Sequence, residues 1–526
     1  MAFSGAVILT DLNDYIAPSQ ACIKPVEIKK NQGDGAPVSI KIDDFGGHFE
    51  VSQDGSETKL ETASITLNDC LACSGCITSA ESILVSMQSH EELYKVFESN
   101  RVAIEQGKTQ DVKTVVVSIA PQSRASIAAK YRLTPLQVAQ RITHFLKSLG
   151  VDYVFDTSFS RDFSLIESAR EFVERYRVLQ EKQSASRIVN NDGGDVEGLK
   201  PKRIRRAGNN SRENSFMVEA RLPMLASSCP GWICYAEKTH GFTLPYISET
   251  KSPQQIMGVL VKDYLANKIG VKPNQIYHVS VMMCYDKKLE ASREDFINNE
   301  YHTHDVDCVI TSGELDKMFE EQNFKIAECT TAMTSSFDSF TKMNSEGNLL
   351  GTSGTGSGGF LEYILSYAAK ELFGVSGVDV DQEEGVVVKI GKNKDFKEIS
   401  LEIDGKSVLK FASAYGFRNI QNLIRKIKTS SSPYHYVEVM ACPSGCINGG
   451  GQLKPTESSI SVKDWINQVD KLYRSVDNES PENNESVQRL YIDWLEGKDS
   501  LKCRKIMRTQ YHAVEQTLIN PLTVKW

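Results

Sequence analysis

Eight of the twelve cysteines fall into two groups whose spacing could hold an inorganic centre. In the reducing cytosol, clustered thiols bind metal or do redox chemistry more often than they form disulfides. The first group is a C-x2-C-x2-C run with one further cysteine far upstream, and the second is spread over three segments. The two groups are Cys22, Cys70, Cys73 and Cys76, and Cys229, Cys284, Cys442 and Cys446.

The first group has the spacing of an iron–sulfur site. Thiolates at Cys70, Cys73 and Cys76 can converge on one small centre from a tight loop, to which Gly75 gives backbone freedom. A cubane cluster needs a fourth thiolate, and Cys22 is the only other cysteine in this part of the chain. We therefore predict one cluster here. A structural zinc site would accept the same ligands and is the alternative, although zinc sites usually pair their cysteines in two separated C-x2-C knuckles.

The second group lies where predicted strands give way to loops. Cys229 lies in SSCPGW, Cys284 in VMMCYDKKLE, and Cys442 with Cys446 in MACPSGCINGGGQ. Sites in α/β sheets form at the carboxyl ends of strands, so these three segments could enclose one buried cluster. The glycines of 449–451 would let backbone approach a bulky inorganic core. By residue type alone, each cysteine is more often a buried core thiol than a ligand.

A parallel α/β framework is predicted around this second group. Thr114–Pro121 is a continuous apolar run, typical of a buried parallel strand. Thr134, Pro135 and Gly150 mark the start and end of a helix, and Val151–Asp156 has the pattern of a second strand. A strand–helix–strand unit calls for a mainly parallel sheet. Further strands are predicted at 276–283, 305–310, 386–391 and 434–440, and a helix at 360–374.

The run GTSGTGSGG at 351–359 contains a G-x-G-x-x-G pattern and precedes a predicted helix. A dinucleotide fingerprint also needs a preceding strand and an acidic partner about 20 residues further on. The preceding NLL is a poor strand, and no G-K-[ST] follows that would make a phosphate-binding P-loop. We predict a flexible loop or one that backs the cluster.

Charge and hydropathy limit the partners of the chain. A net charge of −8 and a pI near 5.8 argue against nucleic acid or an anionic membrane as the main partner. No window approaches 18 uninterrupted apolar residues, so no membrane-spanning helix is predicted. The start, MAFSGAVILTDLNDY, lacks the basic region of a signal peptide and the Arg-rich character of a presequence. We expect a cytosolic protein, with the nucleus as a second compartment.

Five segments together resemble the signature regions of iron-only hydrogenases, in the same order: SSCPGW, KSPQQIMG, CYDKKLE, DVDCVITSGEL and EVMACPSGCINGGGQ. VVVSIAPQSRASIA and VFDTSFSRDFSLIE also match, so the similarity spans about residues 110–455. The resemblance implies two hydrogenase-like lobes with mainly parallel sheets. It also implies that the second cysteine group holds a [4Fe-4S] cluster, with Cys446 at the position that bridges to a di-iron unit in hydrogenases.

Departures from that family argue against hydrogenase activity. Ser228 stands where hydrogenases carry a proton-relaying cysteine, and a hydroxyl cannot cycle a proton as a thiol does. Met283 replaces a proline, and Leu453 stands where many hydrogenases have proline. Lys287 and Glu290 of the second signature region are kept. We therefore expect a relative that is not an enzyme.

The ACIKP segment, the SSCPGW form and a carboxyl-terminal tryptophan resemble the eukaryotic iron-only-hydrogenase-like proteins, also called nuclear prelamin A recognition factor-like proteins. This resemblance implies a cytosolic iron–sulfur protein assembly factor with two [4Fe-4S] clusters, which links the early scaffold to the late targeting complex. Trp526 would be recognised by the targeting machinery; packing of this side chain on the domain is the alternative. An iron-only hydrogenase-type oxidoreductase and a prelamin-binding interaction protein are the alternative functions.

The predicted organisation follows from composition and from the resemblance. Residues 181–215 are polar and aperiodic, which predicts a flexible insertion. Its basic residues at 200–206 could be a nuclear address, although a solvated loop is the simpler interpretation. The predicted parts are an N-terminal ferredoxin-like iron–sulfur domain (1–110), part of the first α/β lobe (111–180), the insertion (181–215), the hydrogenase-like lobes with the buried cluster (216–455) and a C-terminal helical tail (456–526).

Overall fold

The computed structural model describes residues 39–42, 48–51, 57–59, 85, 87–191, 221–329, 337–380, 382–391, 393–457 and 459–514, with side chains described at 85, 87–181 and all later ranges. The first cysteine group, the basic run at 200–206 and Trp526 lie outside the described residues. The predictions made for them therefore stay predictions. Near the amino terminus, the described backbone forms an antiparallel sheet of β1 (Ser39–Ile42), β2 (His48–Val51) and β3 (Glu57–Lys59).

The first large sheet is parallel throughout. Its strands lie in the order β10 (Cys308–Thr311), β7 (Ile276–Met282), β4 (Thr114–Ile119) and β5 (Tyr153–Asp156). All three pairings between neighbours are parallel, with Val117 opposite both Val154 and Val279. The four strands predicted here and their parallel arrangement are confirmed.

Helices cover both faces of this first sheet, which explains its continuous apolar strands. On β4, Val115 and Val117 belong to a core formed with α3 (His90–Glu105), α5 (Pro135–Leu149) and α11 (Ser312–Glu321). Val116 points to the opposite face, into a second core that includes α8 (Pro253–Val259), α15 (Glu485–Asp493) and α16 (Leu501–Met507). A strand buried on both sides needs apolar residues at every position. Cys308 is completely buried in β10.

The crossover between β4 and β5 contains two helices, where one was predicted. Pro121 begins α4 (Pro121–Tyr131) two residues after the strand ends. Proline is favoured in a first helical turn because it lacks the amide hydrogen that the turn leaves unpaired. The predicted second helix is confirmed as α5: Thr134 forms a capping box with Gln137, and Gly150 ends it with φ 104°.

The second large sheet is mixed. Its order is β12 (Val386–Ile390), β13 (Phe396–Ile403), β14 (Lys406–Tyr415), β15 (Tyr436–Met440) and β6 (Met224–Leu225). The first three strands pair antiparallel, and β14, β15 and β6 pair parallel. Strands β12 and β15 were predicted and are confirmed. The β13–β14 hairpin was not predicted, although its turn residues Asp404 and Gly405 both have positive φ, the Asp-Gly signature of a tight hairpin.

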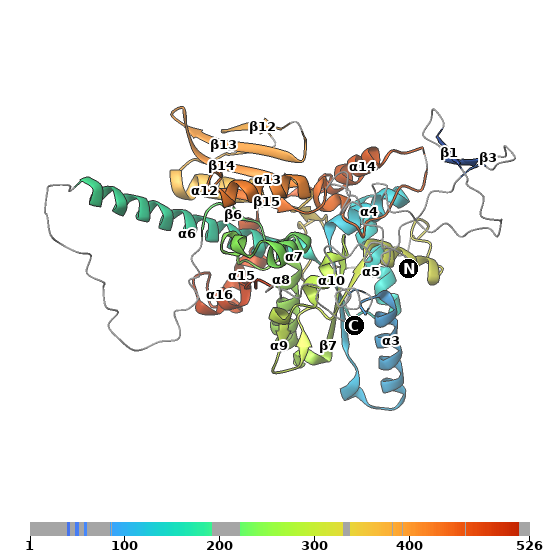
Figure 1. Ribbon diagram of the computed structural model, residues 1–526. Helices are drawn as coiled ribbons and strands as arrows, with labels where there is room; N and C mark the ends of the chain where they lie inside the picture. Colours follow the sequence, from blue (N-terminus) through green and yellow to red (C-terminus); the bar gives the residue numbers. More distant parts are fainter. Residues whose placement is uncertain are drawn as a thin grey trace, which may run out of the picture.

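Both faces of the second sheet are also covered. The helix α12 (Phe360–Phe373), predicted to end at Gly374 and confirmed to do so, packs on one face, and α7 (Pro230–Thr239) with α13 (Phe417–Lys428) on the other. The long helix α6 (Thr157–Asn191) joins the two halves of the molecule. Its Phe163 lies in the core beside the first sheet and its Phe172 in the core of the second. Figure 1 shows β12–β14 above α6 and β7 below it.

Helix α6 also corrects one prediction. It continues to Asn191, so residues 181–191, predicted as the start of an irregular insertion, are helical. Helical periodicity is weak in these polar residues, which is why the sequence did not indicate it. The remainder of the predicted insertion, 192–215, lies outside the described residues.

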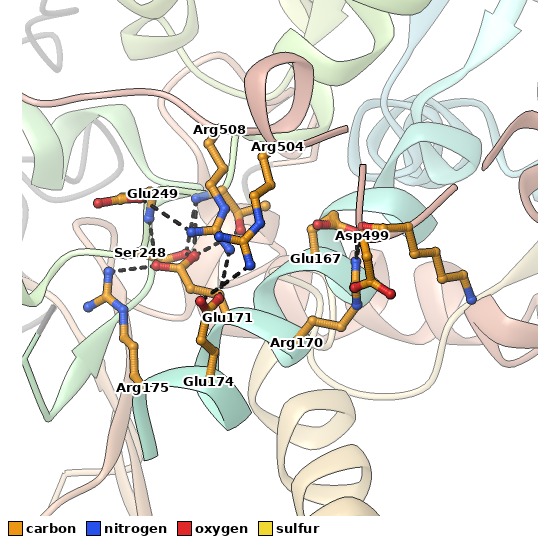
Figure 2. Close-up of polar contacts among 12 residues, drawn as sticks. Glu167, Arg170, Glu171, Glu174, Arg175, Ser248, Glu249, Asp499, Arg504 and Arg508 are labelled. Atoms are coloured by element: carbon orange, nitrogen blue, oxygen red, sulfur yellow. Dashed lines mark hydrogen bonds and ion pairs between the residues drawn. The ribbon is translucent and has the colours of Figure 1, made fainter. Parts of the chain in front are cut away.

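The C-terminal segment docks on α6 beside the buried carboxylate of Glu171 (Figure 2). Glu171 accepts hydrogen bonds from the Ser248 hydroxyl at 2.7 Å and the Glu249 amide at 3.0 Å, and it pairs with Arg175. Although burial favours its neutral form, these arginine and amide partners hold the pKa of Glu171 below its ordinary value. Beside it, Arg508 pairs with Glu174 at 3.2 Å, just beyond α16. The tail is therefore integrated into the fold.

The predicted C-terminal helices are α15 (Glu485–Asp493) and α16 (Leu501–Met507), and α14 (Val462–Arg474) precedes them. None of the helices in the described parts of the chain is both long enough and apolar enough to span a membrane. The remaining elements are α8 (Pro253–Val259), the π-helix Leu260–Leu265, α9 (Ala266–Ile269), α10 (Asp286–Ala291), β8 (Ile297–Asn298), β9 (Thr303–His304), β11 (Leu350–Gly351), β16 (Asp477–Asn478) and the 3-10 turns Thr109–Asp111, Gly241–Tyr246, Pro273–Gln275, Glu294–Phe296, Gly445–Asn448 and Pro481–Asn483.

Candidate metal centre

The four cysteines of the second group follow the carboxyl ends of strands from both large sheets. Cys284 comes two residues after β7 of the first sheet, and Cys229 follows β6 of the second and forms the N-cap of α7. Cys442 comes two residues after β15, and Cys446 lies in the short 3-10 turn Gly445–Asn448. The predicted position of these cysteines at strand ends is thus what the structure shows.

The structure brings the four thiols into one neighbourhood. Cys446 packs against the apolar core that contains Cys229, and both Cys446 and Cys284 pack against a small buried cluster that includes Met282 and Met283. Cys442 interacts electrostatically with all three other cysteines. Within the described ranges, no three His, Cys, Asp or Glu side chains are placed to hold a single metal ion.

Burial makes the free thiolates unfavourable. It raises the pKa of Cys446 to about 12 and the pKa values of Cys284 and Cys442 well above the ordinary thiol range. The neighbouring cysteines act in the same direction, since a second negative charge nearby disfavours ionisation, while Lys287 opposes the shift. Four soft donors held close together, two of them buried, suit a cationic centre that would compensate their charge, as iron does in cysteine-ligated clusters.

Backbone amides and a serine hold the cysteine loops in place. The Ala441 amide donates to Cys229 Sγ at 3.3 Å, and the Cys446 amide donates to Ser357 Oγ at 3.2 Å. Hydrogen bonds to a ligating sulfur orient the ligand and tune the electronic properties of a bound centre. Ser357 was not singled out in the sequence. Its place in the glycine-rich run 351–359 was the available signal.

That glycine-rich loop lies behind the Cys446 segment, as predicted for a loop that backs the site. A Cβ at Gly356 would lie 2.2 Å from Ile447 Cγ1, so only glycine permits the contact. The Gly356 carbonyl also accepts a hydrogen bond from Gln122 Nε2 at 3.0 Å. The loop therefore contacts both α4, which follows β4 of the first sheet, and the segment that carries Cys446.

Two of the glycines after Cys446 allow close packing between the lobes, and their predicted approach to an inorganic core stays a prediction. A Cβ at Gly449 would lie 2.4 Å from the Met283 carbonyl oxygen, and one at Gly451 would lie 2.7 Å from Thr311 Cβ. The Gly451 amide donates to the same Met283 carbonyl at 2.9 Å. These two glycines allow the loop of one lobe to lie against the backbone of the other.

Two of the signature segments meet at a buried polar network. Lys287 Nζ lies 2.7 Å from Glu290 Oε2, and both side chains are buried. Gln254 donates to the Lys287 carbonyl at 3.0 Å, and the Ser252 hydroxyl donates to Glu290. The segment 251–255 therefore fixes the helix that directly follows Cys284. Asp286, which the sequence analysis did not single out, is also buried here, and burial raises its pKa to about 6.

A C-terminal strap, residues 508–514, packs against Glu237 and Arg293 beside this region. Tyr511 lies beside Arg293, whose guanidinium pairs with both oxygens of Glu237 at 2.8 Å. The backbone amides of His512 and Val514 donate to the side chain and carbonyl of Glu237. Glu237 lies on α7, which begins after Cys229, and Arg293 follows α10, which begins after Cys284. The strap thus ties together the two helices that carry ligand candidates from different lobes.

Comparison with known proteins assigns this architecture to a family. The chain belongs to the family described as iron only hydrogenase large subunit, C-terminal domain, whose pattern matches residues 113–188 and 206–450. It is similar over its full length to proteins named for iron–sulfur assembly. One is the cytosolic Fe-S cluster assembly factor narfl of Xenopus tropicalis, 51% identical over 526 residues, which cover 100% of this chain and 99% of that protein. Another is cytosolic iron-sulfur assembly component 3 of Mus musculus, 49% identical over 525 residues with the same coverage.

Solved hydrogenases share the fold. The apo [FeFe]-hydrogenase HydA1 from Chlamydomonas reinhardtii superposes with a TM-score of 0.59 and 27% identity, covering 76% of this chain and 95% of that one. The structure of HydA(deltaEFG), which concerns stepwise [FeFe]-hydrogenase H-cluster assembly, superposes with a TM-score of 0.61 and 26% identity. The match covers 81% of this chain and 99% of that one. These matches confirm the predicted family and the predicted hydrogenase-like α/β fold.

Proposed function

We propose that this chain is a cytosolic iron–sulfur protein assembly factor that carries two [4Fe-4S] clusters and does not act as a hydrogenase. The convergence of Cys229, Cys284, Cys442 and Cys446 at strand ends of two sheets carries the proposal. The full-length relatives named as cytosolic assembly factors support it. When bound, a cluster supplies reversible one-electron chemistry or serves as inorganic cargo.

In this proposal, Cys229, Cys284, Cys442 and Cys446 hold the inner cluster and Cys22, Cys70, Cys73 and Cys76 the outer one. The inner thiols lie where the two lobes meet, Cys229 and Cys442 are buried, and the buried Lys287–Glu290 pair braces the helix that follows Cys284. Such a site would exchange its cluster slowly. An outer cluster on a separate N-terminal domain would be the exchangeable one, suited to electron relay or to cluster transfer.

The partners proposed are the early scaffold and the late targeting complex of cytosolic assembly, the latter through Trp526. The protein would then serve apoproteins of the cytosol and the nucleus. No role in nucleic-acid or membrane binding is proposed, in keeping with the net charge of −8. Ser228 supports the non-hydrogenase assignment, because its hydroxyl cannot replace a proton-relaying thiol.

The test is iron and sulfide analysis with EPR on anaerobically purified full-length protein. We expect about eight iron and eight sulfide per chain, as two cubane clusters require. Cys284→Ala and Cys73→Ala should each remove about half of both and abolish different EPR signals. Cys308→Ala, which removes a buried thiol outside both groups, should leave the content unchanged. Zinc without sulfide would contradict the proposal, and hydrogen evolution by the maturase-treated protein would contradict the non-enzymatic part.

A further inference from the structure

A cavity of about 70 Å³ lies beside the start of the glycine-rich loop, outside the candidate metal centre. It is enclosed by that loop and by residues of α4, α5, α6 and α14. One water needs roughly 10–15 Å³ on this scale, so the space holds a group of about five non-hydrogen atoms. The polar side chains that line it are those of Arg124, Ser158, Arg161, Thr352, Tyr473, Arg474 and Asn478.

The charge of the lining is one-sided. Three arginines line the cavity, and none of the described residues that line it is a carboxylate. Arg124 and Arg161 are only 4% and 3% exposed. Asp156 pairs with Arg124 from outside the lining. Even so, burial and the neighbouring Arg161 lower the pKa of Arg124 to about 10, so two buried guanidiniums lie close enough to repel each other.

Several buried donors around the cavity are left without acceptors. Among the described residues, Nε of Arg124, Nε of Arg161 and the hydroxyl of Thr352 have no hydrogen-bond partner. Buried donors, above all charged ones, are costly when unpaired, so native structures nearly always satisfy them. Arg161 uses its Nη1 on the Tyr473 hydroxyl at 2.6 Å, which fixes the guanidinium but leaves the Nε hydrogen available.

Two helices begin at the same cavity. Pro121, the first residue of the eleven-residue α4, and Pro135, the first of the fifteen-residue α5, both line it. Helix N-termini carry a partial positive charge and favour anions. Together with the arginines, they make the space attractive to a compact anion rich in acceptor oxygens.

We propose that this cavity binds a phosphate group, as inorganic phosphate or as the terminal phosphate of a nucleotide. The volume fits one phosphoryl group, and guanidinium forks match its oxygens. The side chain of Arg474, which pairs through Nε with Asp470 at 2.8 Å, is 40% exposed and lies at the outer side, where the rest of a nucleotide would extend into solvent. The glycine-rich loop, whose pattern alone did not qualify as a nucleotide fingerprint, forms one wall through Gly351, Thr352 and Gly354.

The inference is independent of the proposed clusters, although the two sites share a loop. Thr352 lies at the cavity, and Ser357 of the same loop accepts the Cys446 amide hydrogen bond. The binding test therefore uses affinity for phosphate as its readout, and not iron content. Failure of one proposal leaves the other standing.

The test is calorimetric titration of full-length, cluster-loaded protein with sodium phosphate, with sodium chloride at equal ionic strength as reference. We expect one saturable site per chain and a rise in melting temperature that follows its occupancy. ADP and sulfate are titrated into the protein in the same way, in separate experiments. ADP binding at least tenfold tighter than phosphate identifies a nucleotide, whereas equal or weaker binding identifies free phosphate.

Two variants locate the site. Thr352→Val removes one unpaired donor and should weaken phosphate about three- to tenfold, while phosphate-free stability stays equal or rises. A purely structural hydroxyl would instead lower that stability. Arg474→Gln, at the exposed side, should weaken phosphate about two- to fivefold. Arg132→Gln at the other end of α4 removes the same charge from an exposed ion pair with Glu457 and should change nothing.

Absence of saturable binding would overturn the proposal. So would binding that Thr352→Val and Arg474→Gln leave at the wild-type affinity, since this describes an adventitious ion only. If Thr352→Val does not fold, the pair of Arg474→Gln and Arg132→Gln decides the question alone. Equal weakening by both arginine variants would mark general surface electrostatics and would also overturn it.

Discussion

The two lobes contribute unequally to the candidate metal centre. The first, built on a wholly parallel sheet, supplies Cys284 and the buried Lys287–Glu290 pair. The second, built on a mixed sheet, supplies Cys229, Cys442 and Cys446. Neither lobe holds all four of these thiols, so they come together only while the lobes are joined. The structure joins them in three ways: through α6, through the loop of Gly449 and Gly451, which packs against Met283, and through the C-terminal strap.

The largest expected effect tests whether the lobes are one folding unit. Phe145→Ala in the first lobe and Phe172→Ala in the second should each lower the free energy of unfolding by about 3–5 kcal/mol, because both rings are fully buried. Since α6 lies in both cores, we expect one shared transition in denaturant, shifted by either change. Leu501→Ala, at a side chain that is 85% exposed, is the control. Two separate transitions, each moved by only one variant, would show independent lobes.

A second comparison concerns acid stability of the first lobe. Burial lowers the pKa of His278 in β7 to about 4, whereas an unfolded histidine titrates near 6.5. Between pH 4 and pH 6.5, the unfolded chain therefore binds a proton at His278 that the folded protein does not bind. Stability is complete above pH ~6.5 and falls by about 2 kcal/mol on going to pH 5, and further towards pH 4.

His278→Gln should flatten that pH dependence, at some cost in stability at pH 7 through the lost hydrogen bond with Ser118. His435 beside the second sheet also has its pKa lowered by burial, so His435→Gln should act with the same sign. Unfolding free energies measured at pH 7 and pH 5 provide the check. An undiminished acid effect in His278→Gln would assign it to other groups.

The smallest effects contrast two glycines. Gly405 has φ +72° in the β13–β14 turn, so Gly405→Ala should destabilise by about 1 kcal/mol despite open space around it. Gly313 lies in the first turn of α11 without positive φ, and its nearest Cβ contact would be 3.8 Å away. Gly313→Ala should therefore stabilise by about 0.5–1 kcal/mol. Thermal unfolding measures both, and equal signs would contradict this conformational argument.

The sequence predicted the first sheet better than the second, for a physical reason. Strands such as β4 and β7 are apolar at every position because helices cover both faces, and this pattern is distinctive. Strand β13, FKEISLEI, alternates polar and apolar residues from Glu398 to Ile403, a half-buried strand pattern that was not recognised, and β14 begins with exposed polar residues. The Asp404–Gly405 turn was the local signal for this hairpin.

For the candidate site, residue types and loop positions were predictable, but the packing was not. All four inner cysteines lie at strand ends as expected. The roles of Ser357, Asp286 and the C-terminal strap arise from contacts between segments more than 50 residues apart in sequence, as with Ser357 and Cys446. Spacing along the chain carries no information about such contacts, whereas the resemblance to a known family supplied the order of the segments.

The C-terminal strap has a consequence for biosynthesis. Residues 508–514 come after every cysteine of the inner group, and they join α7 to the segment after α10 through Glu237 and Arg293. While the chain is being translated, Cys229 and Cys284 emerge long before Cys442 and Cys446, and the strap emerges after all of them. The strap's contacts with Glu237 therefore form only after synthesis has passed residue 514, once all four cysteines of the inner group have been made. The part of the joint between the lobes that depends on the strap is in this way the last to be completed.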